Sequence, residues 1–471
     1  MFTPLTQLSL LAVLHLLLAA WSVYHILLFK RDPRAAMAWL MVCVFFPFFG
    51  PVSYFLFGIN RVRTRAANVR RSFLAIDYEG AARRTYVNSA EIPPGVGGIG
   101  QRITGLELLP GNSVAVFQNG DQAYPAMLEA IANAERHVLL STYIFKVDTV
   151  GNEFAQALAA ATARDVDVRV LIDGVGEYYS WRKPVRFLQQ KGVEAARFLP
   201  PRLLPPSVHL NLRNHRKVMV VDSSVAYVGG MNISAQNVSQ DGEPARIADT
   251  HFSLRGPVVE DLAGLFIRDY QFTTGRRIAY EHGKSEAQAN ASCRVIADGP
   301  DGDLDAIILV IQSVISAATE SVDILTPYFL PGREIMSALQ SASLKGVRVR
   351  IVLPGTNNLF YMQWANRNVL AELLQLGIQV FYQPGSFCHS KLLVIDNDYS
   401  LIGSANLDSR SLRLNFELGI EIFSATLNSE LRAQIDGAIA ASRRLQYDEL
   451  ASRSVPVRLR DSLASLMSPY L

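Results

Sequence analysis

The stretch His215-Arg216-Lys217-Val218-Met219-Val220-Val221-Asp222 recurs later in the chain as His389-Ser390-Lys391-Leu392-Leu393-Val394-Ile395-Asp396. Each copy continues with a glycine and then an asparagine at matching distances: Gly229 and Asn232 in the first copy, Gly403 and Asn406 in the second. Chance is a poor explanation, because His, Lys, Asp and Asn are each a small fraction of an average chain. The repeated polar residues are therefore candidates for one site built from two halves.

The four apolar residues inside each copy predict a short buried strand. Residues two apart on a strand share a face. His215 and Lys217 should therefore point the same way, as should His389 and Lys391. Each copy then presents an imidazole and an ammonium group on one side of its strand.

The two parts of the chain are similar beyond these motifs. Val138–Phe145 is similar to Val322–Phe329, and Val168–Gly174 is similar to Val349–Gly355. A helical pattern separates the two segments of each part, so the order is strand, helix, strand and then motif. We expect two similar α/β halves, 106–280 and 281–471, packed so that both motifs meet at one interface.

The amino-terminal residues predict a membrane anchor. Residues 2–29 contain no Asp, Glu, Lys or Arg, and this run exceeds the roughly 20 apolar residues that cross a bilayer. A second uncharged run, 35–60, is interrupted by Pro47 and Pro51, so it either spans as a kinked helix or re-enters. A secretory signal peptide fits badly, because the run is too long and lacks a basic start. We expect two transmembrane segments within 1–65 and a linker over 66–105.

Basic residues favour one orientation in the membrane. Arg61, Arg63 and Arg65 follow the second segment, whereas the extreme amino terminus has no basic side chain. The positive-inside rule then favours a multi-pass protein of the cell (inner) membrane with a cytoplasmic catalytic region. The same arginines fit either contact with anionic headgroups or a solvated linker.

Composition excludes some classes of function. A net charge of +3 over 471 residues is too small to favour a nucleic-acid-binding protein. Cys43, Cys293 and Cys388 have neither metal-ligand spacing nor an obvious pairing, so neither a zinc site nor a disulfide framework is expected.

The repeated residues suit phosphodiester chemistry. Lys217 and Lys391 can neutralise the non-bridging oxygens of a phosphodiester. Hydrogen bonds to the phosphate are expected from a further set of side chains: Asn232, Asn406 and Ser404. A neutral imidazole is a competent nucleophile near pH 7 and forms a covalent intermediate. The second histidine can protonate the leaving alkoxide and later accept a proton from the incoming alcohol.

The paired motifs resemble the signature of the phospholipase D superfamily, H-x-K-x4-D followed by G-x-x-N. More narrowly, the chain is similar to bacterial cardiolipin synthases along essentially its whole length, with the closest stretches at Asn211–Lys217, Gly229–Asn232 and Gly403–Glu417. The resemblance implies two α/β/α sandwich halves with the active site at their interface. It also implies a phosphohistidine intermediate, no metal or other cofactor, and a catalytic set comprising His215, Lys217, Asp222, His389, Lys391 and Asp396. By the same analogy His215 is the nucleophile and His389 the general acid and base.

Each histidine needs an acid that orients its other ring nitrogen. Glu417 matches the acidic residue that follows the second motif in the superfamily, and we expect it to orient His389. Asp249 occupies the comparable strand of the first half, and we expect it to orient His215.

Two observations distinguish some motif residues from the histidines and lysines. Asp222 and Asp396 fall at the far ends of their strands, which favours a structural role for both. Ser404 stands where the first copy has Gly230, so the half-sites differ if the Ser404 hydroxyl contacts phosphate.

The resemblance implies that one phosphatidylglycerol forms the phosphatidyl-enzyme and that a second attacks it, giving cardiolipin and glycerol. The expected partners are therefore phosphatidylglycerol and membrane lipids. A membrane-anchored hydrolase of phospholipid or nucleic acid is the alternative, and a non-catalytic scaffold is a weaker one. Residues 458–467 have amphipathic spacing, which fits either a membrane-surface helix or a helix docked on the protein.

Overall fold

The computed structural model describes residues 4–30, 33–58, 95–201, 212–278, 280, 289–299 and 305–466. The chain forms two compact units, Met1–Arg65 and Ala66–Leu471. Most of the expected linker, 66–94, lies outside the described residues, but its last part forms helix α5 (Val96–Thr104), which packs on β9 and α10.

The amino-terminal unit consists of helices, namely α1 (Pro4–Phe29), α2 (Pro33–Phe45), α3 (Phe49–Ser53) and the π-helical turn η1 (Tyr54–Gly58). Among the described residues one helix, over Leu10–Phe29, is long and apolar enough to cross a membrane. The second apolar run is divided because α2 ends at Phe45, just before Pro47, and proline interrupts helix hydrogen bonding. The prediction of two membrane-spanning helices is therefore not confirmed. The arginines expected to follow this unit lie outside the described residues.

The first half of the larger unit alternates strands and helices: β1 (Leu109–Gln118), α6 (Asn119–Ala132), β2 (His137–Thr142), α7 (Thr149–Thr162), β3 (Asp167–Asp173), η2 (Gly176–Tyr179), α8 (Pro184–Gln190), β4 (Glu194–Phe198), β5 (Val218–Val221), β6 (Val225–Gly229), η4 (Ala235–Asn237), β7 (Ile247–Ala248), β8 (Thr250–Arg255) and α9 (Val258–Thr274). The repeated strands expected from the sequence are present as β2, β3 and β5.

The second half repeats this order: β9 (Ala291–Asp298), α10 (Ala306–Ala317), β10 (Ser321–Leu325), β11 (Phe329–Leu330), α11 (Arg333–Leu344), β12 (Arg348–Pro354), α12 (Phe360–Gln375), β13 (Gln379–Gln383), β14 (Phe387–Cys388), β15 (Leu392–Ile395), β16 (Tyr399–Gly403), β17 (Leu407–Asp408), α13 (Ser409–Leu414), β18 (Glu417–Phe423) and α14 (Ala425–Ala440). Three short elements follow: β19 (Arg443–Arg444), α15 (Tyr447–Ala451) and α16 (Val455–Leu466).

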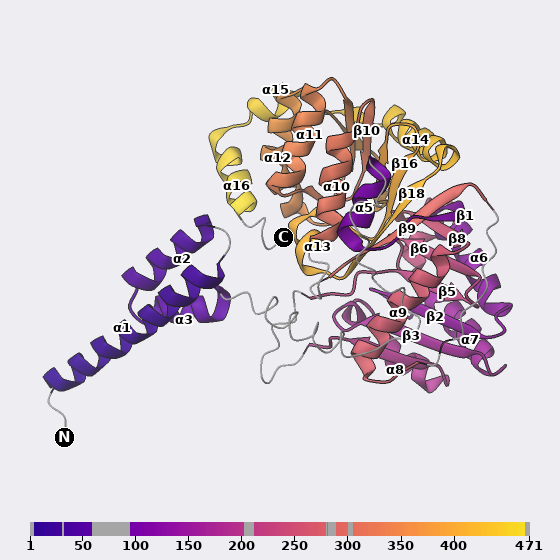
Figure 1. The fold of residues 1–471 in the computed structure, drawn as a ribbon, viewed down its shortest axis with the longest axis horizontal. Coiled ribbons are helices and arrows are strands. Elements are labelled where there is room, and N and C mark those ends of the chain that lie inside the picture. The colour runs from indigo at the N-terminus through magenta and orange to yellow at the C-terminus, as the bar shows by residue number, and fades with distance from the viewer. Residues whose placement is uncertain are drawn as a thin grey trace. The chain divides into compact units, whose positions relative to one another are not determined.

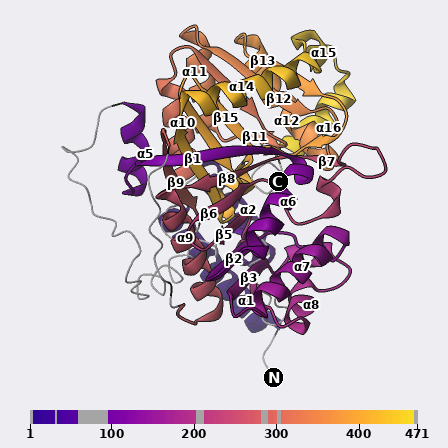
Figure 2. The same ribbon diagram turned by 90° about the vertical axis from the view of Figure 1, so that its right-hand side faces the viewer.

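The strands of both halves join edge to edge in one sheet, ordered β19-β13-β12-β10-β15-β16-β18-β9-β1-β8-β6-β5-β2-β3-β4. The antiparallel pair β1 and β9 forms the junction, and Figure 2 shows the long strand β1 crossing between the halves. The order is mirrored about this junction. The two motif strands, β5 and β15, therefore hold matching places on either side of it. Both are labelled in Figure 2, and Figure 1 shows the two halves to which they belong.

Helices cover both faces of the sheet, which explains the continuous apolar tetrads. On β5, Met219 and Val221 belong to the core beneath α6, α7 and α8. Val218 and Val220 are also buried, and the helix packed against β5 from the other side is α9. A strand covered on both faces needs apolar side chains at every position. The burial thus fixes each motif strand within the sheet, and the polar His and Lys side chains come just before the first residue of that strand.

Candidate active site

Both histidines lie just before their motif strands, in segments that pair with the opposite half. The backbone amide of His215 donates to the carbonyl of Phe416 (2.9 Å), and the amide of Phe416 donates to the carbonyl of Arg213 (2.8 Å). The second motif repeats this contact, because β14 pairs in parallel with β7 and the amide of His389 donates to the carbonyl of Ala248 (2.7 Å). Each histidine is therefore held in place by backbone of the other half.

The orienting acids are exchanged between the halves. Nδ1 of His215 lies 3.1 Å from Oε2 of Glu417, and Nδ1 of His389 lies 2.8 Å from Oδ2 of Asp249. The prediction that Glu417 orients His389 and Asp249 orients His215 is therefore wrong in its pairing, although both acids contact a histidine. The physical reason is the cross-half backbone pairing, which sets Glu417 beside His215 and Asp249 beside His389.

Glu417 is the more firmly held of the two acids. Its carboxylate accepts hydrogen bonds from the Ser404 hydroxyl (2.5 Å) and the Asn415 side-chain amide (3.0 Å) as well as facing His215. Burial alone would raise the pKa of Glu417. Attraction to His215 and Lys217, together with the donated hydrogen bonds, outweighs burial and lowers that pKa. Glu417 is thus an anion fixed behind the His215 ring.

Ser404 and Gly230 make the half-sites unequal in a way the sequence did not indicate. The Ser404 hydroxyl, expected to contact phosphate, instead donates to Glu417, and it accepts from the Leu418 amide (2.9 Å). In the first half a Cβ at Gly230 would lie only 2.7 Å from the Asp249 carboxylate and 2.9 Å from Nζ of Lys391. Glycine is therefore required at position 230, because a side chain there would clash with Asp249 and Lys391. Ser404 instead holds the Glu417 carboxylate in place by a hydrogen bond.

The two lysines are buried beside their histidines. Nζ of Lys217 donates to the carbonyl of His215 (2.5 Å), and Nζ of Lys391 lies 2.9 Å from Nδ1 of His389. Burial lowers the pKa of Lys217 to about 7 and that of Lys391 to about 8, against the attraction of Glu417 and Asp249. An anionic phosphodiester placed here would favour the protonated form of both lysines.

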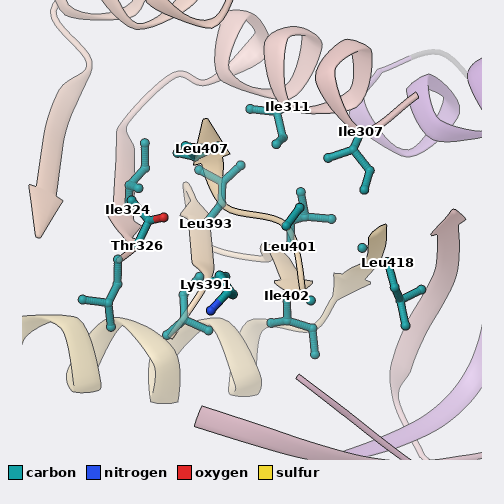
Figure 3. A pocket seen from close by; sticks show the side chains of 15 residues that line it. Ile307, Ile311, Ile324, Thr326, Lys391, Leu393, Leu401, Ile402, Leu407 and Leu418 are labelled. Atoms are coloured by element: carbon teal, nitrogen blue, oxygen red, sulfur yellow. The ribbon is translucent and has the colours of Figure 1, made fainter. Parts of the chain in front are cut away.

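The surroundings of Lys391 explain part of this burial. Its stem borders a small cavity of about 30 Å³ in the second half, walled mainly by aliphatic side chains such as Ile324, Leu393 and Leu401 (Figure 3). These walls keep water from the stem, so the ammonium group depends on the site itself for stabilising partners.

Burial also lowers the pKa of each histidine. For His389 burial and then the Lys391 ammonium bring the pKa to about 4. For His215 burial lowers the pKa although Glu417 opposes it. Both imidazoles are therefore neutral near pH 7. With Nδ1 facing a carboxylate, the proton resides on Nδ1 and Nε2 carries the lone pair.

A cavity of about 310 Å³ brings both histidines together with side chains from each half. Asn232 lines it and accepts at Oδ1 from the amide of Ile144 (3.0 Å). Asn406 also lines it and donates to the Ser411 hydroxyl (3.1 Å), while its Oδ1 is buried without a partner among the described residues. The motif asparagines thus form part of the wall of the cavity that both histidines face.

Three lining residues were missed by the sequence reasoning. The ring of Tyr143 meets His215 edge-on, with 5.2 Å between ring centroids, and Tyr328 lines the second half of the cavity. Both tyrosines belong to the repeated segments Val138–Phe145 and Val322–Phe329, which was the available signal, although their positions in the two segments are offset by one residue. Arg410 also lines the cavity and belongs to the stretch after Gly403.

Asp222 and Asp396 have structural partners. The carboxylate of Asp222 accepts from the amides of Glu135, Arg136 and His137, where β2 begins. Asp396 accepts in the same way from the amides at 319–321, where β10 begins. Both aspartates follow the ends of their motif strands that lie away from the histidines, where they tie these strands to β2 and β10, and neither is among the residues that line the cavity described above.

Comparison with known families agrees with this architecture. A family model described as "Cardiolipin synthase, PLD-like domain" matches residues 127–269 and 311–439. A second model, "Phospholipase_D-nuclease N-terminal", matches residues 17–58. The two segments of the first match contain the two motifs.

Curated relatives match almost the whole chain. "Cardiolipin synthase 2" of Bacillus anthracis is 30% identical over 459 residues, covering 95% of this chain and 88% of the relative. "Major cardiolipin synthase ClsA" of Bacillus subtilis (strain 168) is 30% identical over 486 residues, covering 98% of each. Among solved structures, a phosphatidylserine synthase of Haemophilus influenzae matches 76% of this chain and 95% of its own, with a TM-score of 0.56 at 15% identity. That likeness shows the fold.

Proposed function

This chain belongs to the phospholipase D-like cardiolipin synthase family of phosphatidyltransferases, and on that premise we propose that it joins two phosphatidylglycerol molecules into cardiolipin and glycerol. The observation that carries the proposal is the pair of histidines that face one cavity, each oriented by an acid from the other half.

In the first step, the phosphodiester of one phosphatidylglycerol lies between His215 and His389. Nε2 of His215 attacks phosphorus, a P–N bond forms, and the P–O bond to glycerol breaks. His389 gives its proton to the departing glycerol oxygen, while Lys217 and Lys391 balance the charge on the non-bridging oxygens. Without substrate the low pKa of His389 leaves this ring neutral near pH 7. The bound phosphodiester anion favours the protonated form, so His389 takes up a proton from solvent as the substrate binds and enters the step as an imidazolium.

In the second step, a hydroxyl of the second phosphatidylglycerol's glycerol headgroup attacks the phosphatidyl group on His215. His389, now neutral, accepts the hydroxyl proton as the new P–O bond forms and the P–N bond breaks. The cycle returns both histidines to their starting protonation states.

His215 suits the role of nucleophile better than His389. The three contacts to Glu417 fix the carboxylate behind the His215 ring, which orients Nε2 towards the cavity. The ring of His389 instead lies against the Lys391 ammonium, 2.9 Å from Nδ1 and 3.1 Å from Nε2. An adjacent cation weakens a nucleophile, whereas it helps a group that must release a proton.

The pH dependence of kcat/KM provides one prediction. Because burial lowers their pKa values, Lys217 loses its charge as the pH rises through about 7 and Lys391 loses its charge as the pH rises through about 8. We expect kcat/KM for phosphatidylglycerol to fall above pH 7 and to fall more steeply above pH 8, approaching about 100-fold per pH unit where both ammonium groups are lost. The phosphodiester itself does not titrate in this range. A profile that stays flat to pH 9.5 would contradict the assignment.

Arg410 is the candidate residue for binding the phosphate of the second phosphatidylglycerol, which is the acceptor. Two anionic phosphodiesters must occupy the cavity, and the lysine pair balances the donor. Of the guanidinium groups lining the cavity, Arg213 is paired with Asp173 (3.2 Å), while Arg410 has no ion pair among the described residues. We propose that Arg410 binds the acceptor phosphate.

Arg410→Gln should therefore raise the KM for acceptor phosphatidylglycerol by about 10- to 100-fold, the value of a charge-assisted hydrogen bond. Hydrolysis of the intermediate by water should continue, so phosphatidate should form a larger share of the product. Arg413→Gln is the matched control, because Arg413 lies on the same helix but pairs with Glu334 (2.6 Å). Equal losses of cardiolipin and phosphatidate in Arg410→Gln would count against an acceptor role.

The membrane arrangement and the domain boundaries are further proposals. We propose that α1 anchors the chain in the cell membrane and that the catalytic unit faces the cytoplasm, as the basic residues after 60 favour. We also propose that the two halves divide at 106–280 and 281–471.

One assay tests the function as a whole. The purified full chain is incubated with labelled phosphatidylglycerol, and the lipids are separated by chromatography. Cardiolipin with stoichiometric glycerol supports the proposal, phosphatidate alone indicates a hydrolase, and unchanged lipid indicates a scaffold.

A further inference from the structure

The last described helix, α16, turns its apolar side chains outward. Val455, Leu459, Leu463 and Leu466 are each at least 61% exposed. Their spacing places them along one side of the helix. A helix on the surface of a water-soluble domain normally buries such a stripe, so the four side chains suit an apolar environment outside the protein.

The inward face of α16 carries a charge instead. Asp461 is fully buried and is held by three arginines, with Arg460 at 2.7 Å, Arg367 at 3.4 Å and Arg453 in direct contact. A rotation of α16 about its axis that buried the leucines would turn Asp461 outwards. The ion pairs between Asp461 and the three arginines would then be broken. The ion pairs therefore fix the stripe on the outside.

The stripe lies one layer of side chains from the wall of the active-site cavity. Ala464, on α16, packs against a cluster that includes Tyr328, Leu359 and Met362, and these three residues line the cavity. Figure 2 shows α16 beside α12, the helix that begins at Phe360 and carries Met362. A surface that covered the stripe would therefore also adjoin the cavity.

The cavity has exposed aromatic side chains nearby in both halves. Tyr179 lines the cavity from the first half, and Tyr178 and Trp181 beside it in the sequence are exposed, Trp181 fully. In the second half Phe360, next to the lining residues Leu359 and Tyr361, is also largely exposed. Indole and phenol rings favour the boundary between water and lipid.

We infer that the docking surface, defined as the α16 stripe with Tyr178, Trp181 and Phe360, binds the interface of the lipid bilayer. This inference rests on the proposed function, because it brings the cavity to the leaflet that holds the lipid substrate. The charge of the helix agrees, since α16 itself carries Arg458 and Arg460 against the one acid Asp461. Aliphatic residues flanked by arginines are typical of helices that lie on anionic membranes.

A kinetic comparison tests the inference with the full chain. In Leu459→Ser/Leu463→Ser, activity on phosphatidylglycerol vesicles should fall about tenfold or more, because less apolar area enters the interface. Activity on short-chain phosphatidylglycerol below its micelle concentration should stay within about twofold, since that substrate needs no interface. Leu344→Ser, which alters an equally exposed leucine on α11, should leave both activities unchanged. Equal losses on both substrates, or no loss on vesicles, would overturn the inference.

A fluorescence measurement tests it independently of activity. The native cysteines Cys43, Cys293 and Cys388 are buried, so Leu463→Cys can be labelled selectively with a nitrobenzoxadiazole probe. In liposomes whose acyl chains are brominated, the probe at position 463 should be quenched, and the same probe in Leu344→Cys should not.

An unquenched probe at 463 on an enzyme that makes cardiolipin overturns the docking surface. A quenched probe on a protein that makes no cardiolipin supports the docking surface and counts against the proposed function. If the probe in detergent solution becomes more shielded from water as the protein concentration rises, the stripe contacts a second copy of the chain. That result would overturn the inference.

Discussion

Replacing His215 with alanine should lower cardiolipin formation by a factor on the order of 10⁴ or more, because it removes the atom that bonds to phosphorus. His389→Ala should cause a comparable loss, since glycerol then leaves as an unprotonated alkoxide. Both side chains are slightly exposed at the cavity wall, with 12% and 14% of their surface accessible. The unfolding midpoints of both variants should therefore stay close to that of the parent protein.

The double variant is the informative control for this prediction. Groups that act in one mechanism are strongly non-additive, so His215→Ala/His389→Ala should be no less active than the worse single variant. Losses that multiply in the double variant would mean that the histidines act independently, which contradicts a shared site.

Removal of the orienting charges should produce the second largest effect. In Glu417→Gln the amide that replaces the carboxylate can donate as well as accept, so the proton of His215 is no longer held on Nδ1. A loss of about 10³-fold or more is expected, as for other histidines that lose an orienting carboxylate. Asp249→Asn should act on His389 in the same way.

The exchanged pairing makes these two variants distinguishable. Glu417→Gln should change the chemical reactivity of His215 towards an acylating reagent such as diethyl pyrocarbonate, with His389 unchanged, and Asp249→Asn should do the reverse. Peptide mapping by mass spectrometry measures both sites in one sample. A changed reactivity at His389 in Glu417→Gln would contradict the observed contact at 3.1 Å between Glu417 and His215.

Ser404→Ala is a milder test of the same network. It removes the hydroxyl that donates to Glu417 but leaves the carboxylate. The loss should therefore lie well below that of Glu417→Gln, and its measurement separates the role of the acid from the role of its support.

Much of the fold follows from local sequence signals. The apolar tetrads 218–221 and 392–395 became the buried strands β5 and β15 because helices cover both faces of the sheet there. The His-Lys spacing correctly predicted that both polar groups of each motif lie together, although these residues precede the strands β5 and β15 rather than belonging to them.

The exchanged acids could not be predicted in the same way. They depend on Asn214 pairing with Phe416 and Cys388 pairing with Ala248, which are contacts between residues far apart in the sequence. Treating each half as self-contained assigned each acid to its own half, and the cross-half pairing reversed the assignment.

Two other outcomes also reflect interactions at a distance. The role of Ser404 depends on the position of the Glu417 carboxylate, which the sequence around Ser404 does not predict. The second apolar run was long enough to suggest a membrane span, but the break around Pro47 divides it into shorter helices.

The most direct test of this account is to trap and locate the covalent intermediate. The full chain in phosphatidylglycerol vesicles carrying a labelled phosphate is quenched rapidly at alkaline pH, where a phosphohistidine bond survives, and the labelled peptide is sequenced by mass spectrometry. The account predicts a phosphatidyl group on His215, absent from His215→Ala and from protein incubated without lipid. Label on His389 alone would contradict the assigned roles, and cardiolipin formation with no label on either histidine would contradict the covalent mechanism.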